Sequence, residues 1–364
     1  MAKLKIGVLT GGGDAPGLNA VIYSFTRACL KSMDCELVGY KFGYRGLYNN
    51  DYMPLDYNST TGILHKGGTI LYSSNKDNLF DYQVEENGVS IKKDVSDVAV
   101  ANMKKEGVEI LAILGGDGTL TSARDFARKG VKVIGIPKTI DNDLAATDIT
   151  YGFDTAVNVV TENLGRVHTT AESHQRVLIV EVMGRTAGWI ALHSGLAGSA
   201  DVILIPEIPY QIDKVVDKVN ERDRIGKPFT VIVVTEGAKE KDGEQIVSKV
   251  VSDSPDPIRY GGIGAKIAAD IEARVRNHEV RSCTLGHIQR GGETSAYDRI
   301  LSIRYGVHAA RLIKEGRFGN MVSLRDGKMG HVSLEEVIGT LKLVNPEGEL
   351  VNAARMLGIS FGDR

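Results

Sequence analysis

The sequence has no long apolar run and few cysteines. No stretch approaches the ~18 apolar residues of a membrane span, and the start, MAKLKIGVLTGGGD, lacks the apolar core of a secretory signal. The cysteines, Cys29, Cys35 and Cys283, show neither metal-ligand spacing nor a disulfide framework. These absences predict a cytoplasmic protein in a reducing compartment, with no membrane partner.

The sequence also lacks a strong net charge. A formal net charge of -2 gives no reason to expect nucleic acid or an acidic membrane surface as a partner. Any phosphate binding must therefore come from local sites. With 364 residues, 42% hydrophobic and 25% charged, the chain has the composition of a globular protein, and its length favours two domains of α/β size.

Glycine, by contrast, is abundant. Its 42 residues exceed the average usage of ~7% and gather in the segments GGGDAPG, KGGT, LGGDGT, YGGIGAK and QRGGE. Glycine lets the backbone turn sharply or come close to a ligand. Because these segments are clustered rather than spread along a linker, they predict binding loops.

Short apolar runs alternate with amphipathic stretches along the chain. Apolar runs without clean alternation are typical of parallel strands covered on both faces, and their alternation with helices predicts an α/β fold with parallel sheets. In such sheets the ligand lies beyond the carboxyl ends of the strands, where the polar clusters of this sequence fall. The expected strands are 5–10, 36–42, 109–114, 131–137, 176–184, 201–207, 229–237 and 282–288, and the main expected helices are 19–31, 122–129, 155–170 and 263–277.

Two glycine loops each join a strand to a helix. In GGGDAPG, free amides at a helix start would attract phosphate, although a plain tight turn is the alternative. In LGGDGT, Gly115 and Gly116 free the backbone, Asp117 is suited to Mg²⁺, and Thr119 is expected to cap the next helix while touching phosphate. The alternative for Asp117 is that it satisfies turn amides.

The segment PKTIDND places Lys138, Thr139, Asp141 and Asp143 where a buried strand ends. Phosphoryl transfer to a hydroxyl needs a carboxylate that accepts the proton and a cation that spreads the phosphate charge. This segment supplies both kinds of group. The alternative is that DND forms a turn.

The segment SHQRVLIVEVMGR has Arg176 at the start of a strand and Arg185 past its end. Arginine is the preferred donor to phosphate oxygens, but nine extended residues span roughly 30 Å, so the two cannot hold one phosphate. They must serve different sites or different subunits. Solvated charges at strand ends are the alternative.

Two further strand ends carry polar groups. In RSCTLGHIQRGG, Arg281, His287 and Arg290 lie around a glycine-rich bend and would suit a dianion, although His287 alone would more often be structural. In VVTEG, Glu236 ends an apolar strand, where a carboxylate could bind substrate hydroxyls or simply face solvent.

Taken together, these motifs resemble those of the 6-phosphofructokinases of the bacterial PfkA-like family. GGDGT, PKTIDNDL, SHQR, VEVMGR, TEG and LGHIQRGG occur in the order and approximate spacing of that family, from Lys3 to about Ser360. The resemblance implies two three-layer α/β/α domains with mainly parallel sheets and an active site in the cleft between them. It implies a donor domain of residues 1–152 plus about 289–339, and a fructose 6-phosphate domain of residues 153–288 plus about 340–364.

The resemblance also implies catalytic and sugar-binding roles. Asp141 would take the proton from the sugar 1-hydroxyl with Thr139 and Asp143 beside it, and Arg185 would stabilise the transferring group. The residues implied to hold fructose 6-phosphate are Met183, Gly184, Glu236, His287 and Arg290, joined by Arg176 and Arg281 from a neighbouring subunit. This arrangement implies a homodimer or homotetramer with shared active sites.

For the nucleotide, the resemblance implies ATP with Mg²⁺ held by Asp117. The implied nucleotide-side residues are Gly12, Gly13, Tyr44, Gly116, Gly118 and Thr119. Asn75 replaces an arginine that touches the donor phosphates in the best-known bacterial enzymes, and Lys76 or Lys138 could supply the missing charge.

Two positions bear on the choice of donor. Gly118 matches the ATP-using pattern, because an aspartate there would crowd and repel the α-phosphate. Lys138 matches the pyrophosphate-using pattern and a mixed subgroup that uses ATP. We therefore expect an ATP-dependent 6-phosphofructokinase; a pyrophosphate-dependent phosphotransferase and a catalytically silent sugar-phosphate-binding subunit are the alternatives.

The effector pocket of the family is altered in this sequence. Of the basic positions expected there, Arg27 and Lys227 remain, whereas Tyr23 and Ile225 replace cations. We expect weak or absent activation by ADP and weak or absent inhibition by phosphoenolpyruvate.

Overall fold

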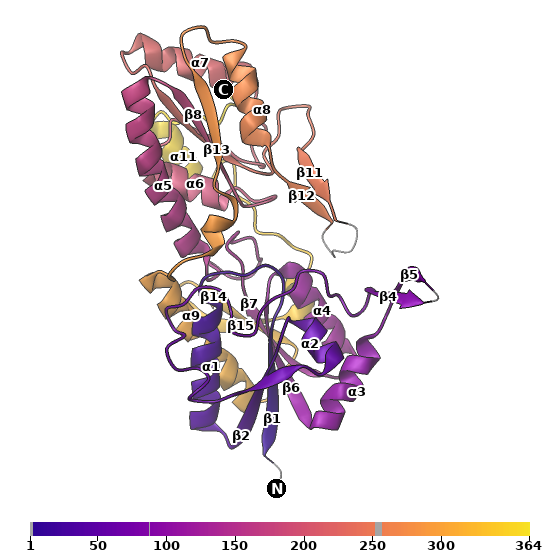
Figure 1. Ribbon diagram of the computed structural model, residues 1–364. Helices are drawn as coiled ribbons and strands as arrows, with labels where there is room; N and C mark the ends of the chain where they lie inside the picture. The colour runs from indigo at the N-terminus through magenta and orange to yellow at the C-terminus, as the bar shows by residue number, and fades with distance from the viewer. Residues whose placement is uncertain (1–2, 87, 252–256) are drawn as a thin grey trace.

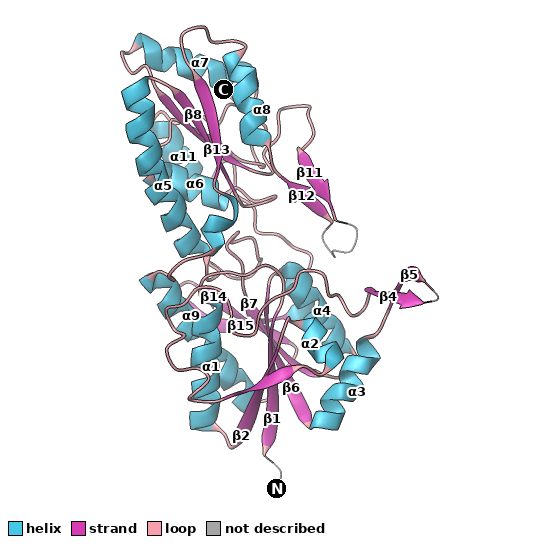
Figure 2. Ribbon diagram, viewed as in Figure 1, coloured by secondary structure: helices cyan, strands magenta, loops and turns pink. Residues whose placement is uncertain are grey.

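The computed structural model describes residues 3–86, 88–251 and 257–364, which form two α/β units, each built on its own sheet (Figures 1 and 2). The apolar runs become strands buried on both faces; in β6, for example, every residue but one is buried. Such strands need helices on both sides to exclude water. The fold class predicted from the sequence, α/β with mainly parallel sheets, is confirmed.

The first sheet has seven strands in the order β15-β14-β7-β6-β1-β2-β3. Pairing is parallel from β14 to β2, and the outermost strands β15 and β3 are antiparallel to their neighbours. The strands are β1 (Leu4–Thr10), β2 (Cys35–Tyr40), β3 (Tyr52–Leu55), β6 (Val108–Gly115), β7 (Lys132–Pro137), β14 (Asn320–Arg325) and β15 (Lys328–Ser333).

Helices cover both faces of this sheet. One hydrophobic cluster joins the sheet to α1 (Leu18–Ser32) and α9 (Ala296–Lys314). A second cluster joins the opposite face to α2 (Tyr44–Asn49), α3 (Ser96–Glu106), α4 (Asp117–Arg128) and α10 (Leu334–Val337). Helix α9 comes late in the chain but packs beside α1, so the chain returns to this unit after building the other (Figure 1).

The second sheet has four parallel strands in the order β13-β8-β10-β9. They are β8 (Val177–Val182), β9 (Val202–Leu204), β10 (Thr230–Thr235) and β13 (Val280–Thr284). One face packs on α5 (Phe153–His174), α6 (Trp189–Ala197) and α11 (Glu349–Met356), and the other on α7 (Ile212–Arg224) and α8 (Ile263–Glu272). Strand β13 lies at an edge of the sheet.

Three smaller elements complete the described chain. Two antiparallel hairpins, β4 (Tyr82–Glu86) with β5 (Val89–Lys93) and β11 (Val247–Val250) with β12 (Ile258–Tyr260), project from the two units (Figure 1). The 3₁₀-helix η1 (Gly286–Arg290) follows β13 and lies between the two units (Figure 1).

After α10, residues 338–344 pass from the first unit to the second, and we call them the crossover segment. In Figure 1 this yellow chain runs between the two units before it enters α11. None of the helices in the described ranges combines the length and apolarity that crossing a membrane requires. The residue bounds of the two predicted domains stay a prediction.

Several sequence expectations about secondary structure are wrong in detail. The helix expected over 263–277 ends at Glu272, and the strand expected over 201–207 covers only Val202–Leu204. The run 282–288 was expected as one strand, but β13 ends at Thr284 and the glycine at 286 opens η1, which turns toward the first unit. The helix expected over 122–129 begins earlier, at Asp117, with Gly116 as its N-cap.

Candidate active site

The two glycine loops meet where the strand order of the first sheet reverses. Strand β1 lies between β2 and β6, so the loops after β1 and β6 are neighbours, and this is where open α/β sheets bind ligands. The Gly11 amide donates to the Leu114 carbonyl (2.9 Å). A Cβ atom on Gly11 or Gly115 would lie 2.6 or 2.3 Å from the Thr119 side chain, so only glycine lets that side chain pack between the loops.

The prediction that Thr119 caps a helix is therefore wrong. Thr119 already lies inside α4, and the N-cap residue Gly116 makes no side-chain capping bond. The physical reason is that the threonine side chain fills the space between the two glycine loops. Asp117, the first residue of α4, places its charge at the positive end of the helix dipole.

Lys138 lies beneath the first glycine loop. It follows β7, is buried, and donates from Nζ to the Gly13 carbonyl (2.6 Å). Gly12 has a φ of +77°, and a Cβ atom there would lie 3.2 Å from this ammonium. Burial, followed by the charge of Arg290, lowers the pKa of Lys138 to about 8. The loop therefore covers a cation held close to its backbone.

Asp141 is a buried carboxylate with one oxygen fixed and one unpartnered. The Thr139 hydroxyl donates to Asp141 Oδ2 (3.2 Å) and accepts from the Asp141 amide (3.1 Å). Asp141 Oδ1 is buried and has no hydrogen-bond partner among the described residues. A buried acceptor of this kind is costly unless the site uses it.

The carboxylate of Asp143 interacts electrostatically with several other charged side chains. Burial raises its pKa well above the ordinary value, and the negative charges of Asp141 and Asp117 act in the same direction, while Arg185 opposes them. The predicted residues Asp117, Asp141, Asp143 and Arg185, from the ends of three different strands, therefore lie within electrostatic reach of one another.

The second sheet contributes Arg185 and Glu236 from the ends of β8 and β10. The Arg185 backbone has a φ of +53°, an unfavourable region for arginine, and its amide donates to Glu236 Oε1 (3.3 Å). A Cβ atom on Gly237 would lie 1.7 Å from the Arg185 carbonyl oxygen, so the glycine of TEG allows this contact. Burial, followed by the charge of Asp141, raises the pKa of Glu236 to about 7.

The 3₁₀-helix η1 bridges the two units. Arg290 donates from one guanidinium nitrogen to the Asp14 carbonyl of the first glycine loop (2.9 Å). The Met183 amide at the end of β8, next to Gly184, donates to the buried Gln289 side chain (3.3 Å). Sequence reasoning missed Gln289, although its place inside the GHIQRGG motif was a usable signal. His287 is exposed on η1.

Arg176 and Arg281 lie away from this cluster. They sit at the amino ends of β8 and β13, neighbouring parallel strands, and both contact the carboxylate of Glu279. Six strand residues separate Arg176 from the carboxyl end of β8, roughly 20 Å. The structure thus agrees with the sequence inference that Arg176 and Arg185 do not share one phosphate within a chain.

On the predicted nucleotide side, Tyr44 is buried and its hydroxyl donates to the Thr119 carbonyl (2.8 Å). Lys76 is exposed, in a loop anchored by the Gly12 amide, which donates to the Ser74 carbonyl (2.9 Å). Gly118 is exposed, and a Cβ atom there would meet no atom within 4 Å. The start of α4 is therefore open on this side.

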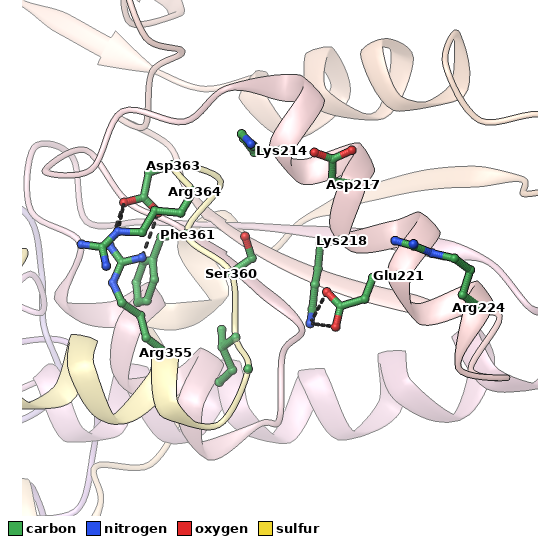
Figure 3. A pocket seen from close by; sticks show the side chains of 12 residues that line it. Lys214, Asp217, Lys218, Glu221, Arg224, Arg355, Ser360, Phe361, Asp363 and Arg364 are labelled. Atoms are coloured by element: carbon green, nitrogen blue, oxygen red, sulfur yellow. Dashed lines mark hydrogen bonds and ion pairs between the residues drawn. The ribbon is translucent and has the colours of Figure 1, made fainter.

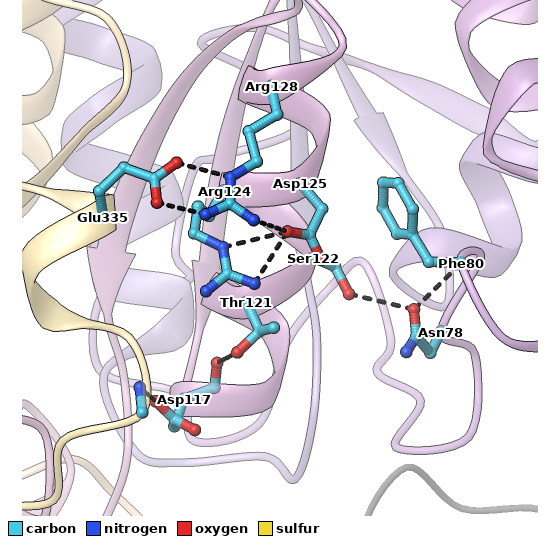
Figure 4. A network of polar contacts seen from close by, with 10 residues as sticks. Asn78, Phe80, Asp117, Thr121, Ser122, Arg124, Asp125, Arg128 and Glu335 are labelled. Carbon is cyan, nitrogen blue, oxygen red and sulfur yellow. Dashed lines mark hydrogen bonds and ion pairs between the residues drawn. The ribbon is translucent and has the colours of Figure 1, made fainter.

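Polar contacts hold α4 against the end of the first unit (Figure 4). Arg128 forms a two-pronged ion pair with Glu335, and the amide of Gly339 donates to Asp117 Oδ1 (3.2 Å). The crossover segment therefore touches the carboxylate predicted to hold Mg²⁺.

Among the described residues, no group of three or more histidine, cysteine, aspartate or glutamate side chains could hold a metal by itself. Mg²⁺ at phosphate-binding sites needs only one or two carboxylates, together with phosphate oxygens. Asp117, at the open start of α4 and near Asp143, is a suitable single ligand.

A separate pocket of about 580 Å³ lies between α7 and the C-terminal residues (Figure 3). Its size suits a small molecule. However, Lys218 is paired with Glu221, and Arg355 is paired with Asp363 through two contacts. With these two cations already paired, the pocket is a weaker candidate than the strand ends that carry Asp141, Arg185 and Glu236.

Arg27, one of the basic residues that remain at the expected effector pocket, contacts other side chains of the same chain. The Arg27 guanidinium lies 4.4 Å from the ring centroid of Tyr23 and 5.4 Å from that of Tyr57, and it donates to the Thr61 hydroxyl (3.3 Å). Arg27 is thus engaged by aromatic faces. The expected weak response to effectors stays a prediction.

The raised pKa of Glu236 predicts a measurable pH effect. Between its ordinary pKa of 4.5 and about 7, the folded chain keeps a proton that the unfolded chain releases, so stability from this group falls as pH rises through that range. Glu236→Gln cannot ionise and should gain stability over the parent at pH 8 but not at pH 5. Thermal unfolding midpoints at both pH values measure this difference.

The control for this measurement is Glu244→Gln, which removes an exposed carboxylate from the same region. It should shift the midpoint equally at both pH values. An equal shift for Glu236→Gln at pH 5 and pH 8 would show that its pKa is not raised.

The fold and site define a two-unit α/β protein in which charged strand ends face one another across η1. Residues 5–313 match the phosphofructokinase family. The chain belongs to this family.

Individual proteins similar to this chain carry names from the same family. A protein named ATP-dependent 6-phosphofructokinase 2, from Clostridium perfringens, is 67% identical over 360 residues, covering 99% of this chain and 98% of its own. A pyrophosphate–fructose 6-phosphate 1-phosphotransferase from Streptomyces coelicolor is 46% identical, covering 94% of this chain and 97% of its own. The solved phosphofructokinase of Saccharomyces cerevisiae, 27% identical, superposes with a TM-score of 0.77 over 92% of this chain and 45% of that one.

Proposed function

We propose that the protein is an ATP-dependent 6-phosphofructokinase of glycolysis, a phosphotransferase with an alcohol group as acceptor. It transfers the γ-phosphate of ATP to the 1-hydroxyl of fructose 6-phosphate. The observation that carries this proposal is the buried Asp141 carboxylate, whose Oδ1 is unpartnered among the described residues and lies in the field of Lys138 and Glu236. The 67% identity to a protein of that name supports it.

The transfer requires one proton acceptor and several positive groups. Asp141 accepts the proton of the sugar 1-hydroxyl as that oxygen bonds to the γ-phosphorus and ADP leaves. Thr139 fixes the other carboxylate oxygen, which aims Oδ1 at the hydroxyl. Lys138 and Arg185 offset the charge on the transferring group, and Asp143 supports the loop.

Asp117 would hold the Mg²⁺ that accompanies ATP, and this ion would supply charge neutralisation to the donor phosphates. We propose Gly12, Gly13, Gly116, Gly118, Thr119, Tyr44 and Lys76 as the lining of the nucleotide side. The exposed start of α4 suits phosphate oxygens, because the first amides of a helix have no partner within that helix.

The sugar phosphate is held by the second unit. We propose Met183, Gly184, Glu236, His287 and Arg290 as its ligands in one subunit. Arg176 and Arg281 reach it from a neighbouring subunit of a homodimer or homotetramer in the cytoplasm. Arg281 lies on the exposed edge strand β13, and Arg176 lies at the start of the neighbouring strand β8, a position that suits an interface. Light scattering measures the size of the assembly.

A donor assay tests the proposal. Formation of fructose 1,6-bisphosphate is measured with ATP and with pyrophosphate after contaminating nucleotide has been removed. We expect faster turnover with ATP, because Gly118 leaves room for an α-phosphate. Faster turnover with pyrophosphate would favour the pyrophosphate enzyme, and tight fructose 6-phosphate binding without turnover would favour the silent binding subunit.

A further inference from the structure

The crossover segment contains a residue that bonds both units through its backbone. The amide of Lys342 donates to the Asp143 carbonyl (2.8 Å), and its carbonyl accepts from the indole of Trp189 in α6 (2.7 Å). Next to it, Leu341 forms a β-bridge with Leu144. Lys342 is therefore fixed between the Asp141–Asp143 loop and the second unit.

The Lys342 side chain turns back onto the same loop. Its ammonium donates to Asn142 Oδ1 (2.8 Å), the Thr147 carbonyl (3.0 Å) and the Asp148 carbonyl (2.8 Å). An ammonium has three donors, and all three are used on neutral oxygens of one loop. Since no donor is left for a substrate, the geometry excludes direct catalysis and indicates a positioning role.

The surroundings of this ammonium are unusual for a lysine. Burial lowers the pKa of Lys342 to about 8, while the charges of Asp148 and Asp143 oppose that change. The Nζ atom also lies 5.7 Å from the centroid of the Trp189 ring. A buried cation of this kind persists only where its hydrogen bonds offset the cost of leaving water.

Asn142 explains why the loop needs such a restraint. It lies between Asp141 and Asp143, whose like charges oppose one another, and its φ of +53° is a left-handed conformation. Its side-chain oxygen accepts from Lys342 and from the Thr150 amide (3.1 Å). Removing the lysine would leave one of these two bonds to hold a strained residue between two acids.

We propose that Lys342 is a positioning residue for phosphoryl transfer: by binding Asn142 and two loop carbonyls, it fixes the direction of the neighbouring Asp141 carboxylate. This inference rests on the proposed function. It goes beyond it because the three ammonium donors of Lys342 are all used on the loop, which gives this lysine a role that binding of substrate does not require. A displacement of about 1 Å at a reacting group can cost on the order of 10²-fold in rate.

The test compares Lys342→Met, Lys342→Arg and Asn142→Ala with the parent enzyme. We expect Lys342→Met and Asn142→Ala to lower kcat about 10- to 100-fold, with both KM values within about threefold of the parent. Lys342→Arg keeps the charge and should recover part of kcat. The exposed Lys105→Met is the matched control and should leave kcat unchanged.

A double variant separates positioning from general destabilisation. Because Lys342 and Asn142 share a hydrogen bond and restrain the same loop, Lys342→Met with Asn142→Ala should lose little more than the worse single variant. Multiplied losses would overturn the proposal, and so would a folded Lys342→Met with parental kcat. If Lys342→Met does not fold, the kcat values of Lys342→Arg and Asn142→Ala are compared with that of the parent instead, and parental kcat in Asn142→Ala would overturn the proposal. A parent that fails to phosphorylate fructose 6-phosphate would instead reject the proposed function.

Discussion

Asp141→Asn is expected to lower kcat by about 10²- to 10⁴-fold while the KM for fructose 6-phosphate changes little. Asparagine matches aspartate in shape but cannot accept the proton of the sugar hydroxyl. The Thr139 hydroxyl can still donate to the side-chain oxygen that replaces Oδ2, so the loop should keep its conformation. Steady-state kinetics with ATP and fructose 6-phosphate measure both constants.

The same variant should be no less stable than the parent. It removes a buried charge whose Oδ1 has no partner within the described chain, and it relieves repulsion with Asp143. The control is Asp34→Asn, at the far, amino end of β2, where the side chain is 82% exposed. Parental turnover by Asp141→Asn would rule out Asp141 as the base.

Gly118→Asp is expected to lower kcat/KM for ATP by at least 100-fold. Two unit charges about 4 Å apart repel by about 4 kcal/mol at an effective dielectric constant of 20, so a carboxylate beside the α-phosphate is strongly unfavourable. The fold should tolerate the change, because a Cβ atom at this position meets nothing within 4 Å and an acid suits the first turn of a helix. Kinetics at saturating fructose 6-phosphate measure the loss.

Gly118→Asn separates charge from bulk at this position. It adds nearly the same volume without the charge, so it should lose much less ATP activity than Gly118→Asp. Pyrophosphate has no α-phosphate, and any activity with it should be spared by both variants. If Gly118→Asp uses ATP as well as the parent does, Gly118 does not determine the donor.

The sequence grouped those candidate residues whose signal is local. Lys138, Asp141 and Asp143 directly follow an apolar strand, and the rule that ligands lie at the carboxyl ends of parallel strands was enough to group them. Arg185 and Glu236 were singled out for the same reason, because they follow the apolar strands β8 and β10. Thr119 was misjudged because hydroxyl residues favour helix N-caps, whereas here packing between Gly11 and Gly115 decides its position.

Other residues could not be predicted, because their partners are distant in sequence. Lys342 bonds Asn142, 200 residues earlier, and a single lysine between two leucines carries no pattern that indicates this. The pairing of Arg176 with Glu279, 103 residues later, depends on β8 and β13 being neighbours, with Val177 opposite Val280. Sheet order sets that contact, and the apolar runs do not reveal sheet order.

Trp189 gives this protein a built-in optical reporter. It is the one tryptophan of the sequence, and its indole reaches from α6 to the Lys342 carbonyl, at the junction of the two units. Indole emission responds to hydrogen bonding and to nearby charge, and the Lys342 ammonium supplies a charge 5.7 Å from the ring centroid. Fluorescence of the unmodified chain therefore reports from a single place, and stopped-flow mixing with either substrate can time rearrangement at the junction without an attached dye.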